Sequence, residues 1–248
     1  MREAGEWRPC IGVIGGMGPA ATADVLRKLV EATGAGRDED HLRIVVDCDP
    51  GIPSPTKHIL GRGPSPVRPL LGSARMLTSQ GAGVLVMACN TAHAFYTPVA
   101  ATAGVPVVHF MRSTAAWLRR EHPRVRSVGV LATTGCARAG LYQHALRQAG
   151  LRPVMPTPAE QRLVQRAIAE PDGIKAGHLD GPRRWLSEVA ARLAARGCDA
   201  VVAGCTEVPL ALDQGCLRAL LVDATAVAAA EAVRIARSAS DRRIQHAV

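Results

Sequence analysis

Short apolar segments rich in β-branched residues alternate along the chain with longer segments, rich in Ala, Leu and Arg, whose apolar residues recur at helical spacing. The short segments predict strands at 11–14, 44–46, 84–87, 105–108, 127–131 and 200–203. The longer segments predict helices at 19–33, 66–80, 113–121, 137–149, 157–170, 182–196 and 224–238. This alternation is typical of an α/β fold with parallel sheets.

Two of the predicted helices carry start signals. Pro19 suits the first turn of a helix, where a missing backbone N–H costs nothing. Thr157 and Glu160 have the spacing of a capping box, with Pro158 at the first helical position. These signals support the helices predicted at 19–33 and 157–170.

An internal repeat predicts how the elements are organised. The segments 84–91 and 200–207 are each an apolar strand that ends in a cysteine and continues into small polar residues, 116 positions apart. We predict two pseudo-symmetric lobes, each a parallel sheet flanked by helices, with Cys89 and Cys205 at the strand ends where open α/β sheets bind ligands. The predicted first lobe is 1–110, with a C-terminal helix at 222–238 packing back on it, and the second is 111–221. The site would lie between them.

Composition and charge narrow the class of protein. With 248 residues, 48% of them hydrophobic and 21% charged, the chain can bury a core without a disulfide or a structural metal. The formal net charge of +9 comes from 27 arginines and three lysines against 21 acidic residues. The arginines are scattered and aromatic residues are few, so we expect solvated helix faces and no nucleic-acid partner.

The cysteine pattern and the chain ends predict the compartment. The seven cysteines are widely spaced, with no Cys-x-x-Cys pair and no cluster at zinc spacing, so neither a disulfide framework nor a metal site is expected. The first ten residues are charged, and Asp223 and Glu231 interrupt the most apolar stretch near the C-terminus. We therefore expect a reduced, cytoplasmic protein without a membrane segment.

A glycine turn follows the first predicted strand, at residues 15–18. Free backbone N–H groups and the positive end of a helix would face this turn, which favours an anion. Residues 16–21 also satisfy a Gly-x-Gly-x-x-Ala nucleotide fingerprint. That match is weak, because Pro19 lies inside it and Asp47 and Asp49 follow about 30 residues later, whereas the fingerprint expects an acidic residue after about 20. A nucleotide-binding α/β protein stays open as an alternative.

The two matched cysteines suggest acid–base chemistry. A lone buried thiol is usually a packing residue, but Cys89 and Cys205 are each followed by hydroxyl or amide side chains and a predicted helix N-terminus, which lowers a thiol pKa from about 8.5. Two opposed thiols could remove a proton from one face of a carbon and return it to the other, with the sulfurs roughly 6 to 8 Å apart. The other five cysteines are assigned to packing or the surface: Cys10, Cys48, Cys136, Cys198 and Cys216.

Four motifs carry a family resemblance: Gly15-Gly16-Met17-Gly18-Pro19, Cys89-Asn90-Thr91-Ala92-His93, Leu131-Ala132-Thr133-Thr134-Gly135 and Gly204-Cys205-Thr206-Glu207-Val208. Over about residues 10–237 the chain resembles the cofactor-independent aspartate/glutamate racemases, in particular the aspartate racemase branch. The resemblance implies a homodimeric two-lobe enzyme that racemises or epimerises an amino acid, by default aspartate, without a cofactor. It implies Cys89 and Cys205 as the two acid/base residues.

The resemblance also implies residues that hold the substrate. Asn90, Thr91, Thr134 and Thr206 match positions that bind its carboxylate or amino group, Met17 matches the pocket residue of the glycine turn, and Lys175 matches a substrate-side lysine. For Thr133, local helix capping is as good an interpretation as binding. We expect His93 to support the cysteine loop without taking part in catalysis.

One departure from the family bears on specificity. Where aspartate racemases typically have Asn-Pro-Gln-Ile-Pro-Asp-Arg-Thr, this chain has Asp-Pro-Gly-Ile-Pro-Ser-Pro-Thr at 49–56, so Pro55 replaces the arginine expected to bind a substrate carboxylate. Arg112, Lys57 or Lys175 could take over that contact. Asp49, where an amide is expected, favours a less anionic or amine-bearing substrate. A decarboxylase, a cis-trans isomerase or a hydantoin-type racemase on the same fold therefore stays open.

Overall fold

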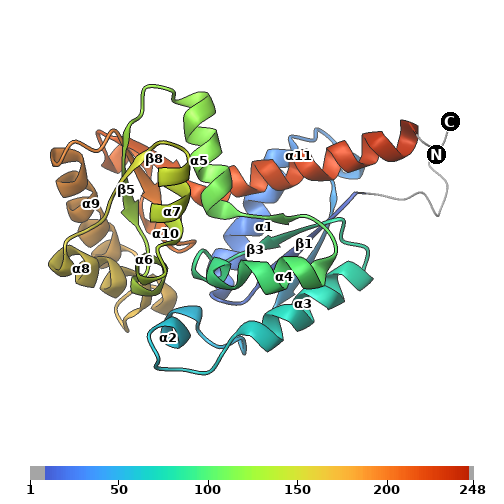
Figure 1. Cartoon of the computed structure of the whole chain (residues 1–248), viewed down its shortest axis with the longest axis horizontal. Coiled ribbons are helices and arrows are strands. Elements are labelled where there is room, and N and C mark those ends of the chain that lie inside the picture. The colour runs from blue at the N-terminus through green and yellow to red at the C-terminus, as the bar shows by residue number, and fades with distance from the viewer. Residues whose placement is uncertain (1–8, 246–248) are drawn as a thin grey trace.

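The computed structural model describes residues 9–245, apart from the side chains of Cys216 and 239–245, so the assignment of Cys216 to packing or the surface lies outside the described part. Two four-stranded parallel sheets form the two lobes (Figure 1). The first has the order β2-β1-β3-β4 and the second the order β6-β5-β7-β8, so the two sheets are wound alike. The predicted two-lobe α/β fold is confirmed.

The strands are short and all neighbours within each sheet run parallel. The first sheet contains β1 (Cys10–Gly15), β2 (Arg43–Cys48), β3 (Val84–Met87) and β4 (Val107–Val108). The second contains β5 (Ser127–Leu131), β6 (Arg152–Val154), β7 (Ala200–Ala203) and β8 (Leu220–Asp223). The central strands β3 and β7 are buried at every position, which is why their sequences are continuously apolar.

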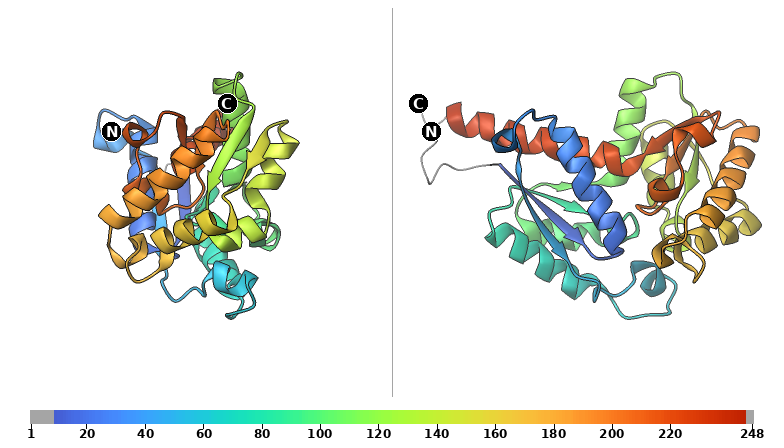
Figure 2. Two further views of the ribbon diagram at one scale, coloured as in Figure 1. Left: turned by 90° about the vertical axis from the view of Figure 1, so that its left-hand side faces the viewer. Right: turned by 180° about the vertical axis from the view of Figure 1, so that it is seen from behind.

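Helices cover both faces of each sheet. Around the first sheet lie α1 (Pro19–Thr33), α3 (Val67–Ser79) and α4 (Tyr96–Ala103), and the short α2 (Pro55–Ile59) packs against the second lobe. After α5 (Phe110–Glu121), the second lobe has α6 (Thr134–Arg138), α7 (Leu141–Gln148), α8 (Pro158–Ala169), α9 (Asp180–Ala195) and α10 (Val208–Ala211). The long α11 (Ala224–Gln245) runs from β8 back across the first lobe and packs against α1 (Figure 2).

The described residues also contain four 3-10 turns: η1 (Asp38–Asp40), η2 (Thr91–Phe95), η3 (Ile174–Ala176) and η4 (Gln214–Cys216). Within residues 9–245, no helix combines the length and the apolar character needed to cross a membrane.

The core follows from the alternation of side chains along the strands. In β1, Ile11 and Val13 point to the layer of α1, α5 and α11, whereas Cys10 and Ile14 point to the layer of α3 and α4. The first of these clusters continues without a break into β5 and β7 of the second lobe. The lobes therefore share one apolar layer on this side, with α5 and α11 between them.

All six predicted strands are present, but the edge strands β6 and β8 were missed. β6 is only three residues long and contains Pro153, and β8 is half-exposed, so neither forms a conspicuous apolar segment. The strand predicted at 105–108 is limited to its last two residues.

The boundary between the lobes, predicted between residues 110 and 111, stays a prediction, since α5 packs against both α11 and α7.

The long helices were predicted from the sequence, and the short helices α2, α4 and α10 were missed. The capping box at Thr157 and Glu160 is confirmed, with both reciprocal bonds formed. The helix predicted at 137–149 is instead two helices, α6 and α7, because Gly140 adopts a left-handed conformation between them (φ 66°). The short helices α2, α4 and α10 have too few turns to show a periodic pattern.

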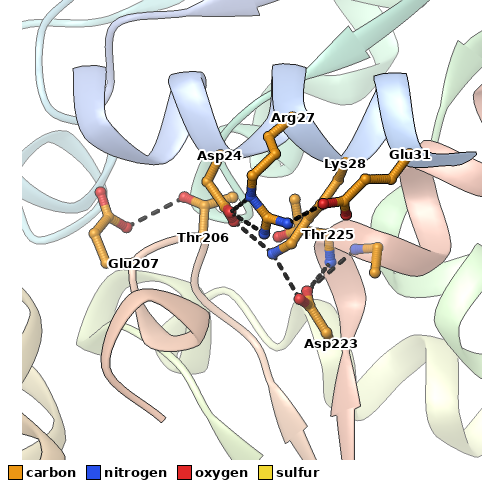
Figure 3. Close-up of polar contacts among 9 residues, drawn as sticks. Asp24, Arg27, Lys28, Glu31, Thr206, Glu207, Asp223 and Thr225 are labelled. Atoms are coloured by element: carbon orange, nitrogen blue, oxygen red, sulfur yellow. Dashed lines mark hydrogen bonds and ion pairs between the residues drawn. The ribbon is translucent and has the colours of Figure 1, made fainter. Parts of the chain in front are cut away.

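A buried lysine ties the first lobe to the junction of β8 and α11 (Figure 3). The side chain of Lys28 is only 7% exposed, and its Nζ lies 2.5 Å from Asp24 Oδ2 and 2.6 Å from Asp223 Oδ2. The other oxygen of Asp223 accepts the backbone N–H groups of Thr225 and Ala226 and so caps the start of α11. Lys28 thus neutralises two carboxylates from different lobes.

We expect Lys28→Met to destabilise the protein, because it keeps the volume of the side chain but removes the cation from Asp24 and Asp223. Breaking a buried ion pair on one side typically costs 3–5 kcal/mol, and Arg27 still contacts Asp24, so a loss of about 3 kcal/mol is expected. Urea unfolding followed by circular dichroism measures it. Lys57→Met, at an exposed lysine, is the control and should stay within about 0.5 kcal/mol of the wild type; equal stability of the two variants would contradict the prediction.

Candidate active site

The two matched cysteines occupy equivalent places in the two lobes. Cys89 follows β3 by two residues, and Cys205 follows β7 by two residues. Since β3 and β7 hold the same position in their sheets, both cysteines lie at the carboxyl edge of a central strand. Both are buried, Cys89 with 8% and Cys205 with 5% of its surface exposed.

The carboxylate of Glu207 joins Cys205 to the first lobe. Its Oε2 accepts hydrogen bonds from Cys205 Sγ (2.8 Å) and from Thr206 Oγ1 (3.2 Å), the latter contact visible in Figure 3. Its Oε1 lies 2.9 Å from the ammonium of Lys175. Lys175 in turn donates to the backbone carbonyl of Met17 in the glycine turn (2.6 Å). Sequence reasoning missed Glu207 as a functional residue, although it stands inside the last of the four family motifs.

The glycine turn has no room for side chains at two positions. A Cβ at Gly18 would lie 2.8 Å from Glu207 Oε1 and 3.4 Å from Lys175 Nζ, so glycine here lets the ion pair approach the turn. At Gly16, φ is +91° and a Cβ would collide with the backbone carbonyl of Asp49. Asp49 itself is exposed, and its Oδ1 accepts the backbone N–H of Gly51. The structure thus brings Met17, Lys175, Thr206 and Cys205 together around Glu207 and leaves the side chain of Asp49 apart.

Burial makes both thiols weak acids. It raises the pKa of Cys205 well above the ordinary value, and the Glu207 carboxylate raises it further against a smaller opposing effect of Lys175. Burial also raises the pKa of Cys89, but there the ammonium of Lys175 opposes it more strongly than Glu207 adds to it. The expectation that helix N-termini lower these pKa values is therefore wrong, because desolvation outweighs the backbone N–H groups of Thr91 and Ala92 near Cys89.

Lys175 keeps its proton in this setting. Burial lowers its pKa, but the carboxylate of Glu207 and the neighbouring Cys205 and Cys89 raise the pKa by more. Lys175 and Glu207 are also the two charges that perturb both thiols, so one ion pair acts on Cys89 and Cys205 together.

Hydroxyl groups connect the lobes beside Cys89. Thr91 Oγ1 lies 2.8 Å from Thr133 Oγ1 of the second lobe, and Thr56 donates to the same oxygen from α2 (3.2 Å). Thr133 also accepts the backbone N–H of Cys136 and caps α6, as one of its two sequence interpretations predicted. The backbone N–H of Thr134 donates to Gln165 Oε1. This contact fixes the turn after β5.

The side-chain amide nitrogen of Asn90 can donate a further hydrogen bond. Its side chain is 1% exposed, and its Oδ1 accepts from the hydroxyl of Tyr142 (2.6 Å). Its Nδ2 has no hydrogen-bond partner among the described residues. A buried amide donor without a partner is costly, so it is suited to receive an oxygen from a ligand.

His93 supports the cysteine loop, as expected from the sequence. Its Nδ1 lies 3.0 Å from the carbonyl of Cys89, and its Nε2 accepts the backbone N–H of Phe110. Burial lowers the pKa of His93, which favours the neutral ring. His93 thus holds the position of the backbone at Cys89.

A pocket of about 400 Å³ opens at the Lys175–Glu207 ion pair. It is lined by the glycine turn and the start of α1 (16–21), by four residues of the 50–55 loop, and by Ile174, Lys175, Glu207 and Leu210. Among the described residues, its lining includes neither Cys89 nor Cys205. Glu207 lines the pocket and also accepts the hydrogen bond of Cys205, so the pocket adjoins this thiol through the carboxylate.

Of the three cations that could replace the missing arginine, only Lys175 lines this pocket. Pro55 is buried in its wall. Arg112 is exposed, with its guanidinium 5.7 Å from the centre of the Tyr96 ring, and Lys57 is exposed on α2.

The remaining described cysteines agree with their assignment. Cys10, Cys136 and Cys198 are buried and Cys48 is exposed, and all of them are free thiols. In residues 9–245, no group of three or more His, Cys, Asp or Glu side chains is placed to hold a metal ion.

Known proteins show to which family the chain belongs. The family model described as Asp/Glu/Hydantoin racemase matches residues 14–232. The chain belongs to this family. Among curated proteins, it is 24% identical over 232 residues to the "broad specificity amino-acid racemase RacX" of Bacillus subtilis, covering 90% of this chain and 96% of that protein. It is 34% identical to a glutamate racemase of Pseudomonas aeruginosa, over 54% of this chain and 48% of that protein.

Solved structures show the same architecture. The aspartate racemase of Picrophilus torridus superposes with a TM-score of 0.82 and 28% identity, over 92% of this chain and 94% of that one. A glutamate racemase from Francisella tularensis, at 17% identity, shares the fold with a TM-score of 0.70, over 94% of this chain and 82% of that one. These relatives are racemases, which are isomerases.

We expect Glu207→Gln to lower the pKa of Cys205, because the substitution removes the negative charge that opposes thiolate formation and frees Lys175 to stabilise it. The fraction of thiolate, followed by its ultraviolet absorbance, should therefore rise at lower pH than in the wild type. Measuring both proteins in a Cys89→Ala background assigns the change to Cys205. An unchanged or higher midpoint would contradict the electrostatic role of Glu207.

Proposed function

We propose that the protein is an amino-acid racemase or epimerase, an isomerase that moves a proton at the α-carbon without a cofactor, with Cys89 and Cys205 as its two acid/base residues. The observation that carries this proposal is the placement of the two buried thiols: equivalent strand ends of two similarly wound lobes, under the influence of one ion pair. The proposed substrate is a small amino acid held between the lobes. A homodimer in the cytoplasm is proposed with it, on the resemblance alone.

The proposed reaction breaks and re-forms one C–H bond. One sulfur, as thiolate, takes the α-proton from one face of the substrate, and the opposing thiol gives its proton to the other face. The negative charge that develops between these steps requires hydrogen-bond donors, and Asn90 Nδ2 together with the hydroxyls of Thr91, Thr134 and Thr206 would supply them. The two thiols therefore exchange roles in the reverse direction.

The ion pair supports unequal resting roles for the two thiols. At Cys205, Glu207 raises the thiol pKa more than Lys175 lowers it. At Cys89, Lys175 lowers the thiol pKa more than Glu207 raises it. We therefore propose Cys89 as the base and Cys205 as the acid in the resting enzyme. When Cys205 acts as the base in the reverse direction, its thiol proton must first leave. The carboxylate of Glu207, which already accepts a hydrogen bond from this thiol, could take that proton.

Cys89→Ala and Cys205→Ala should each abolish racemisation, because each thiol serves only one face of the α-carbon. Loss of a general acid or base typically costs about 10²- to 10⁴-fold in rate. Incubation of single enantiomers of an amino-acid panel in heavy water, read by mass spectrometry and chiral chromatography, separates exchange on one face from full racemisation. Cys48→Ala, at an exposed thiol, is the matched control and should keep wild-type activity.

Full racemisation by either single variant would exclude the two-thiol mechanism. The same incubations, with hydantoins added to the panel, test the alternatives on this fold: loss of carbon dioxide would indicate a decarboxylase, and exchange only with hydantoins would indicate a hydantoin-type racemase.

A further inference from the structure

We propose that the 400 Å³ pocket between the glycine turn and the ion pair binds the side chain of the substrate, and that this side chain is uncharged and mainly aliphatic. The inference rests on the proposed racemase function and adds the substrate class to it. It comes from the lining of the pocket and from the state of its charged groups.

Part of the pocket wall, beside Ser54 and the glycine turn, is apolar and rigid. Pro19, Pro50 and Pro55 line it together with Ile174 and Leu210. Proline offers neither a backbone N–H donor nor a charged group, and its ring restricts the backbone, so this wall presents a fixed hydrocarbon surface. A volume of this size is at the lower end for small-ligand pockets and exceeds what the side chain of one amino acid needs.

The charged groups of the pocket are already paired with each other. Its lining contains one cation, Lys175, and one anion, Glu207, whose charged atoms lie 2.9 Å apart. Lys175 also donates to the Met17 carbonyl at 2.6 Å. An uncharged side chain can enter without disturbing this pair, and the pocket remains electrically balanced when it is filled.

A carboxylate side chain would have to displace Glu207 from Lys175. Glu207 is only 3% exposed, so it would then be left as a buried anion whose remaining contacts are the hydroxyl of Thr206 and the thiol of Cys205. Leaving a buried charged group without its partner is unfavourable, and the entering carboxylate would repel it as well. No second cation lines the pocket in the described part of the chain. Aspartate and glutamate should therefore bind poorly.

Three substrates of similar shape test the inference on the wild-type protein. Aspartate, asparagine and leucine all branch at Cγ, and they differ in carrying a charge, an amide or two methyl groups there. The kcat/KM for α-proton exchange in heavy water should be highest for leucine, followed by asparagine. For aspartate it should be lower by about ten- to hundredfold, the usual effect of losing one hydrogen-bonded charge partner.

The experiment separates failure of this inference from failure of the proposed racemase function. Exchange of aspartate at a rate equal to or above that of leucine would overturn the inference and leave the racemase function standing. Exchange with no amino acid would remove the proposed function, and the inference with it. A preference for leucine and asparagine supports both.

Pro55→Arg adds a cation to the pocket wall and should raise the aspartate-to-leucine ratio of kcat/KM by about tenfold or more. The fold should tolerate it, because Pro55 is the first residue of α2 and Ser54 still caps that helix through its bond to the backbone N–H of Lys57. Pro53→Arg is the matched control, since Pro53 lies in the same loop but does not line the pocket. If both variants shift the ratio equally, a general charge effect is responsible and the placement of the side chain in this pocket is wrong.

Discussion

The carboxylate of Glu207 is the group on which the arrangement between the lobes depends. It is buried, yet each of its oxygens has a partner: Oε1 faces Lys175, and Oε2 faces Cys205 and Thr206. Because Lys175 also contacts the Met17 carbonyl, this one anion connects the glycine turn of the first lobe to the cysteine of the second. A buried anion in the low-dielectric interior needs such partners, so the surrounding residues are constrained by it.

The fold brings the glycine turn and the two cysteines toward Glu207 because they follow the ends of parallel strands. Parallel strands end at one edge of each sheet, which brings the glycine turn after β1, Cys89 after β3 and Cys205 after β7 toward the interface of the lobes. The second ion pair between lobes, Lys28 with Asp223, lies at the end of β8. The shared apolar layer from α5 and α11 holds the sheets together behind these contacts.

The features that could be predicted from the sequence are those with a local cause. The strands 84–87 and 200–203 are continuously apolar because they are central, and the cysteines after them could be matched without a structure. The role of Glu207 could not be predicted in this way, since its partner Lys175 is 32 positions away and the Met17 carbonyl a further 158. The pKa of a thiol is likewise decided by burial and by distant charges, which is why reasoning from the neighbouring helix N-terminus gave the wrong direction. The edge strands were missed because partial exposure removes the apolar signal.

The two lobes are alike in strand order, but the ion pair makes their cysteines unequal. Two positions after Cys89 stands Thr91, whereas two positions after Cys205 stands Glu207. The duplicated framework therefore supplies two thiols in similar settings, and a single acidic side chain in one lobe, paired with a lysine, distinguishes them. Lys175 acts more strongly than Glu207 on Cys89, and Glu207 acts more strongly than Lys175 on Cys205, so the same pair favours ionisation of one thiol and opposes it at the other. Two coupled acids can share one proton even when their settings are alike, so the effect of the ion pair is to decide which of the two proposed catalytic thiols keeps that proton.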